Sequence, residues 1–207
     1  MTPKAVIFDI GNVLIEWKPE RFYDSVIGPE KRSALFGEVD LDGMNAAIDA
    51  GAFFKETVYQ TARAHPKWQA EVEMWYDRWI EMASPRIEGS IHLLRLLRAK
   101  GIAVFTLTNF GIYSFEYAQT QYDFLNEFDR FYVSGRIGLL KPDPELYAFV
   151  ERDCGLVGAE LIFADDREAN ITTAKARGWQ VYQFGTAQGW ADKLVEVGLL
   201  TIKEGQL

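Results

Sequence analysis

The stretch that decides the fold is Ala5-Val6-Ile7-Phe8-Asp9-Ile10-Gly11-Asn12-Val13. Its first four residues are apolar at every position, which is typical of a central strand in a parallel sheet, covered on both faces. The apolar run stops at Asp9, and Gly11 follows two residues later. The pattern therefore predicts a buried strand that delivers the Asp9 carboxylate to the carboxyl end of a sheet.

Strands and helices alternate in the second part of the chain. Ser84-Pro85 is read as the start of a helix that ends near Gly101, and Asp143-Pro144 starts another that Gly155 ends. A third helix is expected over residues 169–177. Strands are expected in four further places, at residues 102–107, 131–133, 161–164 and 179–184. Strands separated by helices of this length imply right-handed crossovers and a parallel sheet.

The segment between these parts has a different character. Apolar residues recur at helical spacing at Leu41, Met44 and Ile48, with no strand of comparable strength nearby. A second stripe runs over about four turns, through Trp68, Val72, Trp75, Trp79 and Met82. We therefore predict an α/β core formed by residues 1–17 and 84–207, interrupted by an all-helical insert over residues 18–83.

Composition narrows the function classes. The 207 residues are 48% hydrophobic and 25% charged, as in a packed domain and not a disordered chain. Thirty acidic against 22 basic residues give a charge of −8, which argues against a nucleic-acid partner. The lone cysteine, Cys154, forms no disulfide within the chain and fits a reducing compartment, and no apolar run approaches a membrane span. We expect a cytoplasmic protein without a membrane partner, either a monomer or a homodimer.

Polar residues of specific types follow three of the predicted strands. They are Asp9, the pair Thr108-Asn109, and the pair Asp165-Asp166, while Lys141 lies in the loop before a helix. In an open parallel sheet these strand ends meet at one edge, where ligands bind. Two carboxylates ~4 Å apart repel by about 4 kcal/mol at the effective dielectric of a protein surface. One carboxylate suffices to cap a helix, whereas three on one edge require a cation.

Four segments resemble the four motifs of the haloacid dehalogenase (HAD) superfamily. In chain order they are Phe8-Asp9-Ile10-Gly11-Asn12-Val13, Leu107-Thr108-Asn109, Lys141-Pro142-Asp143-Pro144 and Phe163-Ala164-Asp165-Asp166. The resemblance implies a HAD-like Rossmannoid core of three layers, with the helical segment as a small C1-type cap after the first strand. The first motif is also similar to that of the glucose-1-phosphate phosphatases, which carry Asp-x-Gly-Asn-Val there.

The resemblance implies a Mg²⁺-dependent phosphatase that acts on a small phosphorylated metabolite, expected to be a sugar phosphate. By this mapping Asp9 attacks phosphorus and forms an aspartyl-phosphate. The expected metal ligands are the Asp9 side chain, the Gly11 carbonyl and Asp166, with Asp165 direct or through water. Carboxylate and carbonyl oxygens are the ligands that Mg²⁺ prefers.

The remaining motif residues are expected to handle the phosphoryl group. Lys141 would neutralise charge between Asp9 and the phosphate, and Thr108 would hydrogen-bond the transferring oxygens. Asn109 is expected to orient the phosphate or the cap side. Trp17, at the entrance to the cap, is a candidate to pack on a sugar face.

Gly11 departs from the pattern, because most phosphatases of the superfamily carry a second aspartate there as general acid and base. Such a group contributes about 10²–10⁴ in rate, and Glu16 is a candidate to replace it. Two alternatives stay open. One is a 2-haloacid dehalogenase, which needs no metal, although the Asp165-Asp166 pair argues against it. The other is a phosphate-binding regulatory module that has lost turnover.

Overall fold

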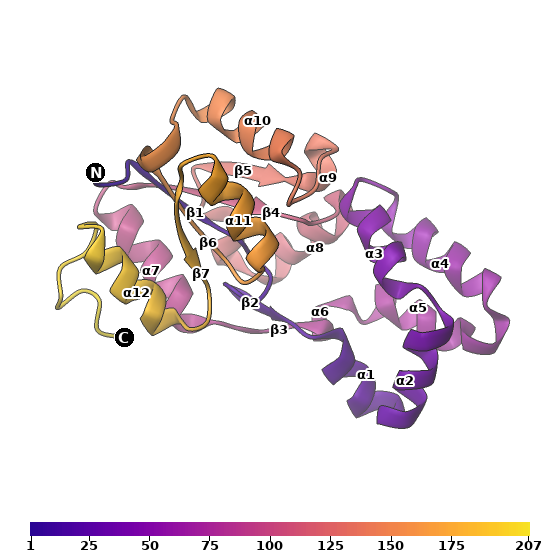
Figure 1. Ribbon diagram of the computed structural model, residues 1–207. Coiled ribbons are helices and arrows are strands. Elements are labelled where there is room, and N and C mark those ends of the chain that lie inside the picture. The colour runs from indigo at the N-terminus through magenta and orange to yellow at the C-terminus, as the bar shows by residue number, and fades with distance from the viewer.

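A five-stranded parallel sheet lies at the centre of the protein (Figure 1), in a computed structural model that describes residues 1–207. The strands are β1 (Ala5–Phe8), β4 (Ala103–Thr108), β5 (Arg130–Val133), β6 (Leu161–Asp165) and β7 (Gln180–Gln183). Their order across the sheet is β5-β4-β1-β6-β7, and all neighbours are parallel. The first strand therefore occupies the middle, as its apolar run predicted.

Helices cover both faces of this sheet, and successive residues of β1 point to opposite faces. The helices around the sheet are α7 (Glu88–Ala99), α8 (Ile112–Gln121), α9 (Ser134–Ile137), α10 (Pro144–Cys154), α11 (Glu168–Ala176) and α12 (Ala187–Glu196). Val6 and Phe8 pack in the larger apolar core, toward α7 and α12, whereas Ala5 and Ile7 pack in a second core, toward α10 and α11. Two short 3₁₀ turns, Asp123–Asn126 and Gly158–Glu160, complete this part.

A helical segment follows the first strand and lies beside the sheet (Figure 1). Its helices are α1 (Pro19–Ile27), α2 (Pro29–Glu38), α3 (Leu41–Asp49), α4 (Phe54–Ala64), a 3₁₀ turn (Pro66–Trp68), α5 (Gln69–Asp77) and α6 (Trp79–Met82). Leu41, Met44 and Ile48 are all buried, as their spacing predicted. The second stripe is buried too, but Arg78 separates α5 from α6, so it does not form one continuous helix.

Two short strands that the sequence analysis missed lie where the chain enters and leaves this segment. They are β2 (Ile15–Trp17) and β3 (Ala83–Arg86), and they pair antiparallel, with Ile15 opposite Arg86. The prediction that Ser84-Pro85 starts a helix is therefore wrong, since both residues lie in β3 and α7 begins at Glu88. Pairing with β2 holds this stretch extended, and a two-stranded sheet tolerates proline because both strands are edges.

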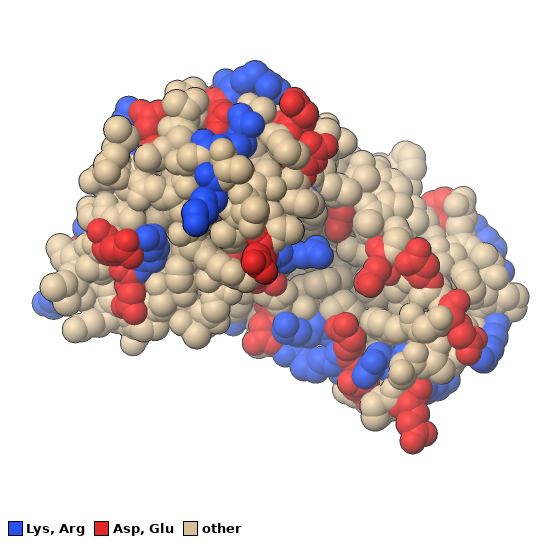
Figure 2. Space-filling view, viewed as in Figure 1, with Lys and Arg blue, Asp and Glu red and all other residues tan.

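The other predicted elements agree with the structure to within a few residues. Asp143 caps α10, where its side chain accepts a hydrogen bond from the backbone N–H of Glu145, and Gly155 ends that helix in the left-handed conformation. No helix has the length and apolar character that crossing a membrane would require. Figure 2 shows acidic and basic side chains interspersed on one face of the molecule, without a broad basic area.

Candidate active site

The carboxyl ends of β1, β4 and β6 bring the predicted polar residues to one edge of the sheet. Phe8 pairs with Thr106 on one side and with Ala164 on the other, so the residues that follow all leave the sheet at the same edge. Asp9 follows β1, Thr108 ends β4 and Asp165 ends β6. The parallel topology therefore places side chains that are up to 156 positions apart in the chain around one point.

Lys141 lies between two of the carboxylates and is itself buried. Its Nζ is 2.9 Å from Oδ1 of Asp9 and 2.6 Å from Oδ2 of Asp165, and its side chain is 1% exposed. Burial acts to lower the pKa of this amine, but the charges of Asp9 and Asp165 outweigh it and hold the pKa above its usual value. The lysine is therefore charged at neutral pH.

The surroundings of Asp9 disfavour a negative charge on its carboxyl group, although Lys141 lies beside it. Burial raises the pKa of its carboxyl to about 7; the lysine opposes the shift, while Asp165 and Asp166 add to it. Its Oδ1 also accepts a hydrogen bond of 2.7 Å from the backbone N–H of Ile10. Without further positive charge, the environment of Asp9 favours the neutral form.

The two aspartates after β6 are held differently. Both oxygens of Asp165 accept hydrogen bonds from Asn170 Nδ2, at 2.9 Å each, and Oδ1 accepts another from the backbone N–H of Arg167. Asp166 accepts one of 3.0 Å from Asn12 Nδ2, and burial raises the pKa of its carboxyl. Asp165 thus accepts several hydrogen bonds from protein donors, while Asp166 accepts one from the side chain of Asn12.

Asn12 supports this arrangement through its backbone conformation. It is the single non-glycine residue with a positive φ, 55°, which asparagine tolerates better than most residues. In that conformation its Oδ1 accepts the backbone N–H of Trp17 at 3.1 Å, while its Nδ2 reaches Asp166. Asn12 therefore connects the first strand to the carboxylates at the end of β6.

The donor set fits a divalent cation. Carboxylate oxygens of Asp9, Asp165 and Asp166 all lie within 4.8 Å of one another. Three carboxylates against the one ammonium of Lys141 leave two net negative charges when all are ionised. A hard divalent ion prefers oxygen ligands and offsets that charge. Gly11, the other predicted ligand, lines the same cavity.

Asn109 contacts Lys141 with both polar atoms of its side chain. Its Oδ1 accepts the backbone N–H of Lys141 at 2.7 Å, and its Nδ2 donates to the carbonyl of that residue at 3.0 Å. The contacts that the structure gives Asn109 are thus with the lysine backbone. Thr108 is buried at the end of β4 and lines the cavity beside Asp9.

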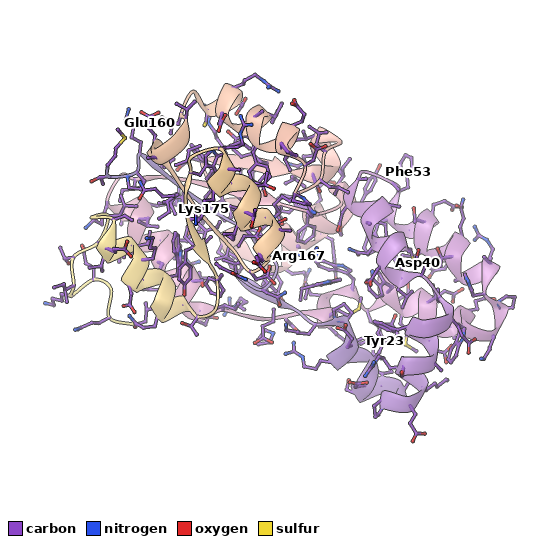
Figure 3. The ribbon with its side chains drawn as sticks, in the orientation of Figure 1. Tyr23, Asp40, Phe53, Glu160, Arg167 and Lys175 are labelled. Atoms are coloured by element: carbon purple, nitrogen blue, oxygen red, sulfur yellow. The ribbon has the colours of Figure 1, made fainter.

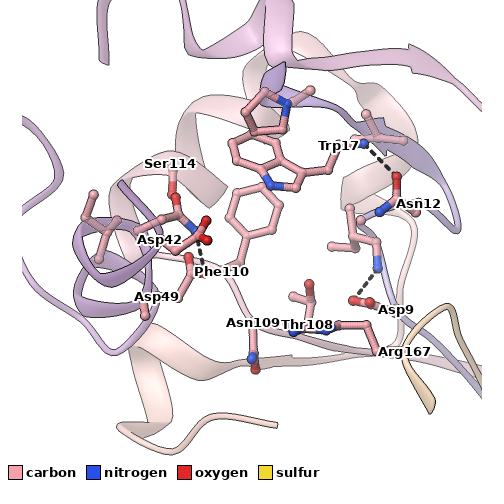
Figure 4. Close-up of a pocket in the computed structure, with 18 of the residues that line it drawn as sticks. Asp9, Asn12, Trp17, Asp42, Asp49, Thr108, Asn109, Phe110, Ser114 and Arg167 are labelled. Carbon is pink, nitrogen blue, oxygen red and sulfur yellow. Dashed lines mark hydrogen bonds between the residues drawn. The ribbon is translucent and has the colours of Figure 1, made fainter. Parts of the chain in front are cut away.

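A cavity of about 580 Å³ extends from these residues toward the helical segment (Figure 4). Trp17 lines it and packs its ring 5.8 Å from both Trp75 and Trp79. Across the space from Asp9, Figure 4 shows Asp42 and Asp49, both carried by α3. The cavity therefore joins the sheet edge to an aromatic wall and to a polar face of one helix.

The basic side chains near the cavity are few. Lys141 and Arg167 line it, and Figure 3 shows Arg167 at the side of the core that faces the helical segment. Glu16, the predicted replacement for a second aspartate, also lines the cavity, but its carboxylate is paired with Arg21. The Glu16 carboxylate therefore contacts an arginine and not a group in the interior of the cavity.

Several site residues escaped the sequence analysis. Asn170 lies five residues after Asp165, in the first turn of α11, so an amide at the start of the helix that follows the last motif was a usable signal. Asn12 stood within the first motif. The polar face of α3, with Asp42, Asn45 and Asp49, gave no signal, because nothing local distinguishes it from a solvated helix face.

Comparison with known protein families decides the affiliation. Residues 3–178 match the model of the haloacid dehalogenase-like hydrolases. The chain belongs to this hydrolase family. The HAD-like chain is 28% identical over 198 residues to a sesquiterpene phosphatase, astK, of Aspergillus oryzae, covering 86% of this chain and 87% of that protein. Over 74 residues it is 31% identical to a D-ribitol-5-phosphate phosphatase of Bacteroides thetaiotaomicron, covering 35% and 36% of the two chains.

Solved structures confirm the HAD-like fold. A HAD family enzyme of Bacteroides thetaiotaomicron, in complex with magnesium and inorganic phosphate, superposes with a TM-score of 0.67 at 22% identity, covering 89% of this chain and 95% of that one. An L-2-haloacid dehalogenase of Xanthobacter autotrophicus also superposes, with a TM-score of 0.61 at 18% identity, covering 98% and 86%. The fold of this HAD-like hydrolase is thus shared by enzymes of different chemistry, so the site must decide the reaction.

Proposed function

We propose that this HAD-like hydrolase is a Mg²⁺-dependent phosphatase that forms an aspartyl-phosphate on Asp9. The observation that carries the proposal is the cluster of three carboxylates around Asp9, with Lys141 buried between two of them. The relatives named as phosphatases and the magnesium and phosphate complex of a structural neighbour support it.

Asp9, Asp166 and the Gly11 carbonyl would hold the metal, with Asp165 nearby. Bound there, Mg²⁺ supplies positive charge that favours the ionised form of the neighbouring carboxylates and offsets the charge of an incoming phosphate. The raised pKa of Asp9 fits this requirement, since the site as built by the protein alone lacks positive charge.

The chain's own residues would then perform the transfer. An Asp9 oxygen attacks phosphorus, the bond from phosphorus to the leaving oxygen breaks, and an acyl phosphate forms. Lys141 lies within 2.9 Å of Asp9 and would hold the developing charge on the phosphoryl oxygens, together with the hydroxyl of Thr108. Water then attacks the same phosphorus and releases inorganic phosphate and free Asp9.

The two alternative functions, a 2-haloacid dehalogenase and a phosphate-binding regulatory module, fit the site less well. A dehalogenase displaces halide with a carboxylate and does not need the second and third carboxylates that Asp165 and Asp166 add here. A binding module without turnover would have no use for a nucleophile held against a charged amine. The acidic cluster and Lys141 together therefore favour phosphoryl transfer.

For the substrate, we propose a sugar phosphate or a similar neutral, hydroxylated ester. Trp17 offers an aromatic face in the cavity, and Asp42 on α3 offers carboxylate oxygens that accept hydrogen bonds from hydroxyl groups. The carboxylates of this wall disfavour a second anionic group on the leaving side. By this proposal the helical segment is a cap that selects the substrate.

The test is a panel of phosphate esters, assayed for release of inorganic phosphate with Mg²⁺ and with EDTA. Sugar 1-phosphates, sugar 6-phosphates, a pentitol phosphate, a C15 prenyl monophosphate and p-nitrophenyl phosphate form the panel. We expect Mg²⁺-dependent release with a preference for the sugar or pentitol esters. Preference for the prenyl ester would overturn the substrate class only, whereas no release from any ester would overturn the phosphatase.

A further inference from the structure

The site lacks an evident proton donor for the leaving group. Gly11 carries no side chain where a second carboxylate would stand two residues after Asp9, and Glu16 is paired with Arg21. An alkoxide leaves poorly unless it is protonated as its bond to phosphorus breaks. A donor must therefore come from another wall of the same cavity.

Asp49 is the carboxyl group that the structure places to do this. It is the last residue of α3 and lines the cavity that contains Asp9 and Thr108. In Figure 4 Asp49 lies across the open space from Asp9. An in-line displacement puts the nucleophile and the leaving oxygen on opposite sides of phosphorus.

The position of Asp49 is also held by neighbours. Its Oδ2 accepts a hydrogen bond of 2.9 Å from Asn45 Nδ2, one turn earlier on α3. The α3 helix meets the core closely here, because a Cβ at Gly111 would lie 2.6 Å from Ile48 Cγ2 and 3.0 Å from its carbonyl. Glycine at position 111 thus lets the end of α3 approach the loop after β4. Thr108 is the last residue of that strand.

The charges around Asp49 favour its protonated form. Burial raises the pKa of its carboxyl to about 7, and the negative charge of Asp9 adds to the shift. The backbone N–H of Gly111 and the charge of Lys141 act in the other direction. Asp49 also stands at the carboxyl end of a helix, where the dipole disfavours a negative charge.

We propose that Asp49 is the general acid and base that replaces the missing carboxylate at position 11. This inference rests on the proposed phosphatase activity. In the first step the Asp49 carboxyl gives its proton to the leaving oxygen as the bond to phosphorus breaks, which yields a neutral alcohol and an Asp49 carboxylate. In the second step that carboxylate takes a proton from the attacking water, phosphate leaves Asp9, and the acid is restored.

The test uses Asp49→Asn and compares two leaving groups. Because kcat/KM covers only the steps up to the first irreversible one, it reports the departure of the leaving group. p-Nitrophenol is a far stronger acid than an alcohol, so its anion leaves without a proton. We expect kcat/KM for the best alkyl phosphate of the panel to fall about 10²-fold, while kcat/KM for p-nitrophenyl phosphate changes less than about 3-fold.

A matched control is Asp77→Asn. Asp77 is likewise the last residue of a helix in the same segment, α5, but it does not line the cavity. We expect the control to leave kcat/KM unchanged for both esters. An equal loss on both esters in Asp49→Asn, or no loss on either, would overturn the role of Asp49 while the phosphatase stands. A wild-type protein that hydrolyses no ester would overturn both.

Discussion

The side-chain amide of Asn109 spans the backbone of Lys141, accepting from its N–H at 2.7 Å and donating to its carbonyl at 3.0 Å. This pair of hydrogen bonds joins the loop after β4 to the loop before α10. It fixes the backbone from which the lysine reaches Asp9. Asn109 therefore acts on the site through the position of Lys141.

We expect Asn109→Ala to lower kcat/KM for p-nitrophenyl phosphate about 10- to 100-fold, since a small displacement of a charged group is costly at a phosphoryl-transfer site. Steady-state kinetics with Mg²⁺ measure the effect. Asn109→Asp keeps the acceptor, but it sets a carboxylate oxygen against the Lys141 carbonyl, so its loss should be at least as large. Full activity in Asn109→Ala would show that Lys141 needs no such support.

Removal of the buried amine should destabilise the protein in a pH-dependent way. In Lys141→Met the carboxylates of Asp9 and Asp165 lose their shared counter-charge, which costs about 3–5 kcal/mol when both are ionised. At low pH Asp9 takes up a proton, because its pKa is about 7 even with the lysine present. Urea unfolding in EDTA should therefore show a larger loss at pH 8 than at pH 5.

Lys175→Met is the control for this experiment. Lys175 is exposed on α11 and should change the free energy of unfolding by less than about 0.5 kcal/mol at either pH. A Lys141→Met loss of the same size at both values of pH would contradict the electrostatic account. Mg²⁺ should restore part of the lost stability at pH 8, because a cation replaces the missing charge.

Substitution of the proposed nucleophile, Asp9, should abolish turnover and leave the fold intact. In Asp9→Asn the amide cannot form an acyl phosphate, so release of phosphate from p-nitrophenyl phosphate should fall to background. Its melting temperature in EDTA should be no lower than that of the wild type, because burial disfavours the charge that the substitution removes. Asp192→Asn, on the exposed face of α12, should keep full activity. Unchanged turnover in Asp9→Asn would rule out the nucleophile.

Asp49 should make the stability of the protein depend on pH. Its pKa is about 7 in the folded chain against 3.8 for an unperturbed aspartate, so the folded state holds the proton more tightly. As the pH rises from about 4 to 7, the wild type therefore loses stability that Asp49→Asn keeps. Urea unfolding with EDTA gives the difference in the free energy of unfolding between Asp49→Asn and the wild type. Between pH 4 and pH 8 we expect this difference to shift in favour of the variant by on the order of 2–4 kcal/mol.

Asp77→Asn is the matched control, measured at the same two values of pH. If Asp49→Asn differs from the wild type by the same amount at pH 4 and at pH 8, the carboxyl of Asp49 carries no raised pKa. The experiment needs no substrate and is thus independent of the phosphatase assay.

A carboxylate restored at position 11 should rescue the loss of Asp49. A Cβ at Gly11 would meet only Trp17 Cβ, at an ordinary 3.8 Å, so Gly11→Asp should fold with little change in melting temperature. In the Asp49→Asn background it should recover at least about 10-fold in kcat/KM for an alkyl phosphate, because it supplies the missing acid. Gly11→Asn is the control. Equal recovery with Gly11→Asn would contradict a proton-donor role.

Much of the fold was predictable from local patterns. The apolar run of β1 and the alternation after residue 100 indicated a parallel sheet, and the strand-end residues identified the edge where Asp9, Thr108 and Asp165 meet. These signals are local, because apolar runs and strand-end polar groups depend on a few adjacent residues. The two-stranded sheet of β2 and β3 was not predicted, because its strands are short and become extended only by pairing with each other. For the same reason Pro85 looked like a helix start although it lies in a strand.

The tertiary structure alone decided which partner each functional group has. The sequence by itself determined the chemical inventory of the predicted site, because Asp9 and the acidic pair follow strands and Lys141 lies in the third of the four motifs. It did not determine that Asn109 supports Lys141, that Arg21 occupies Glu16, or that Asp49 faces Asp9 across the cavity. Those relationships depend on how the helical segment and the loops dock onto the sheet, and that docking is set by apolar packing between residues far apart in the chain.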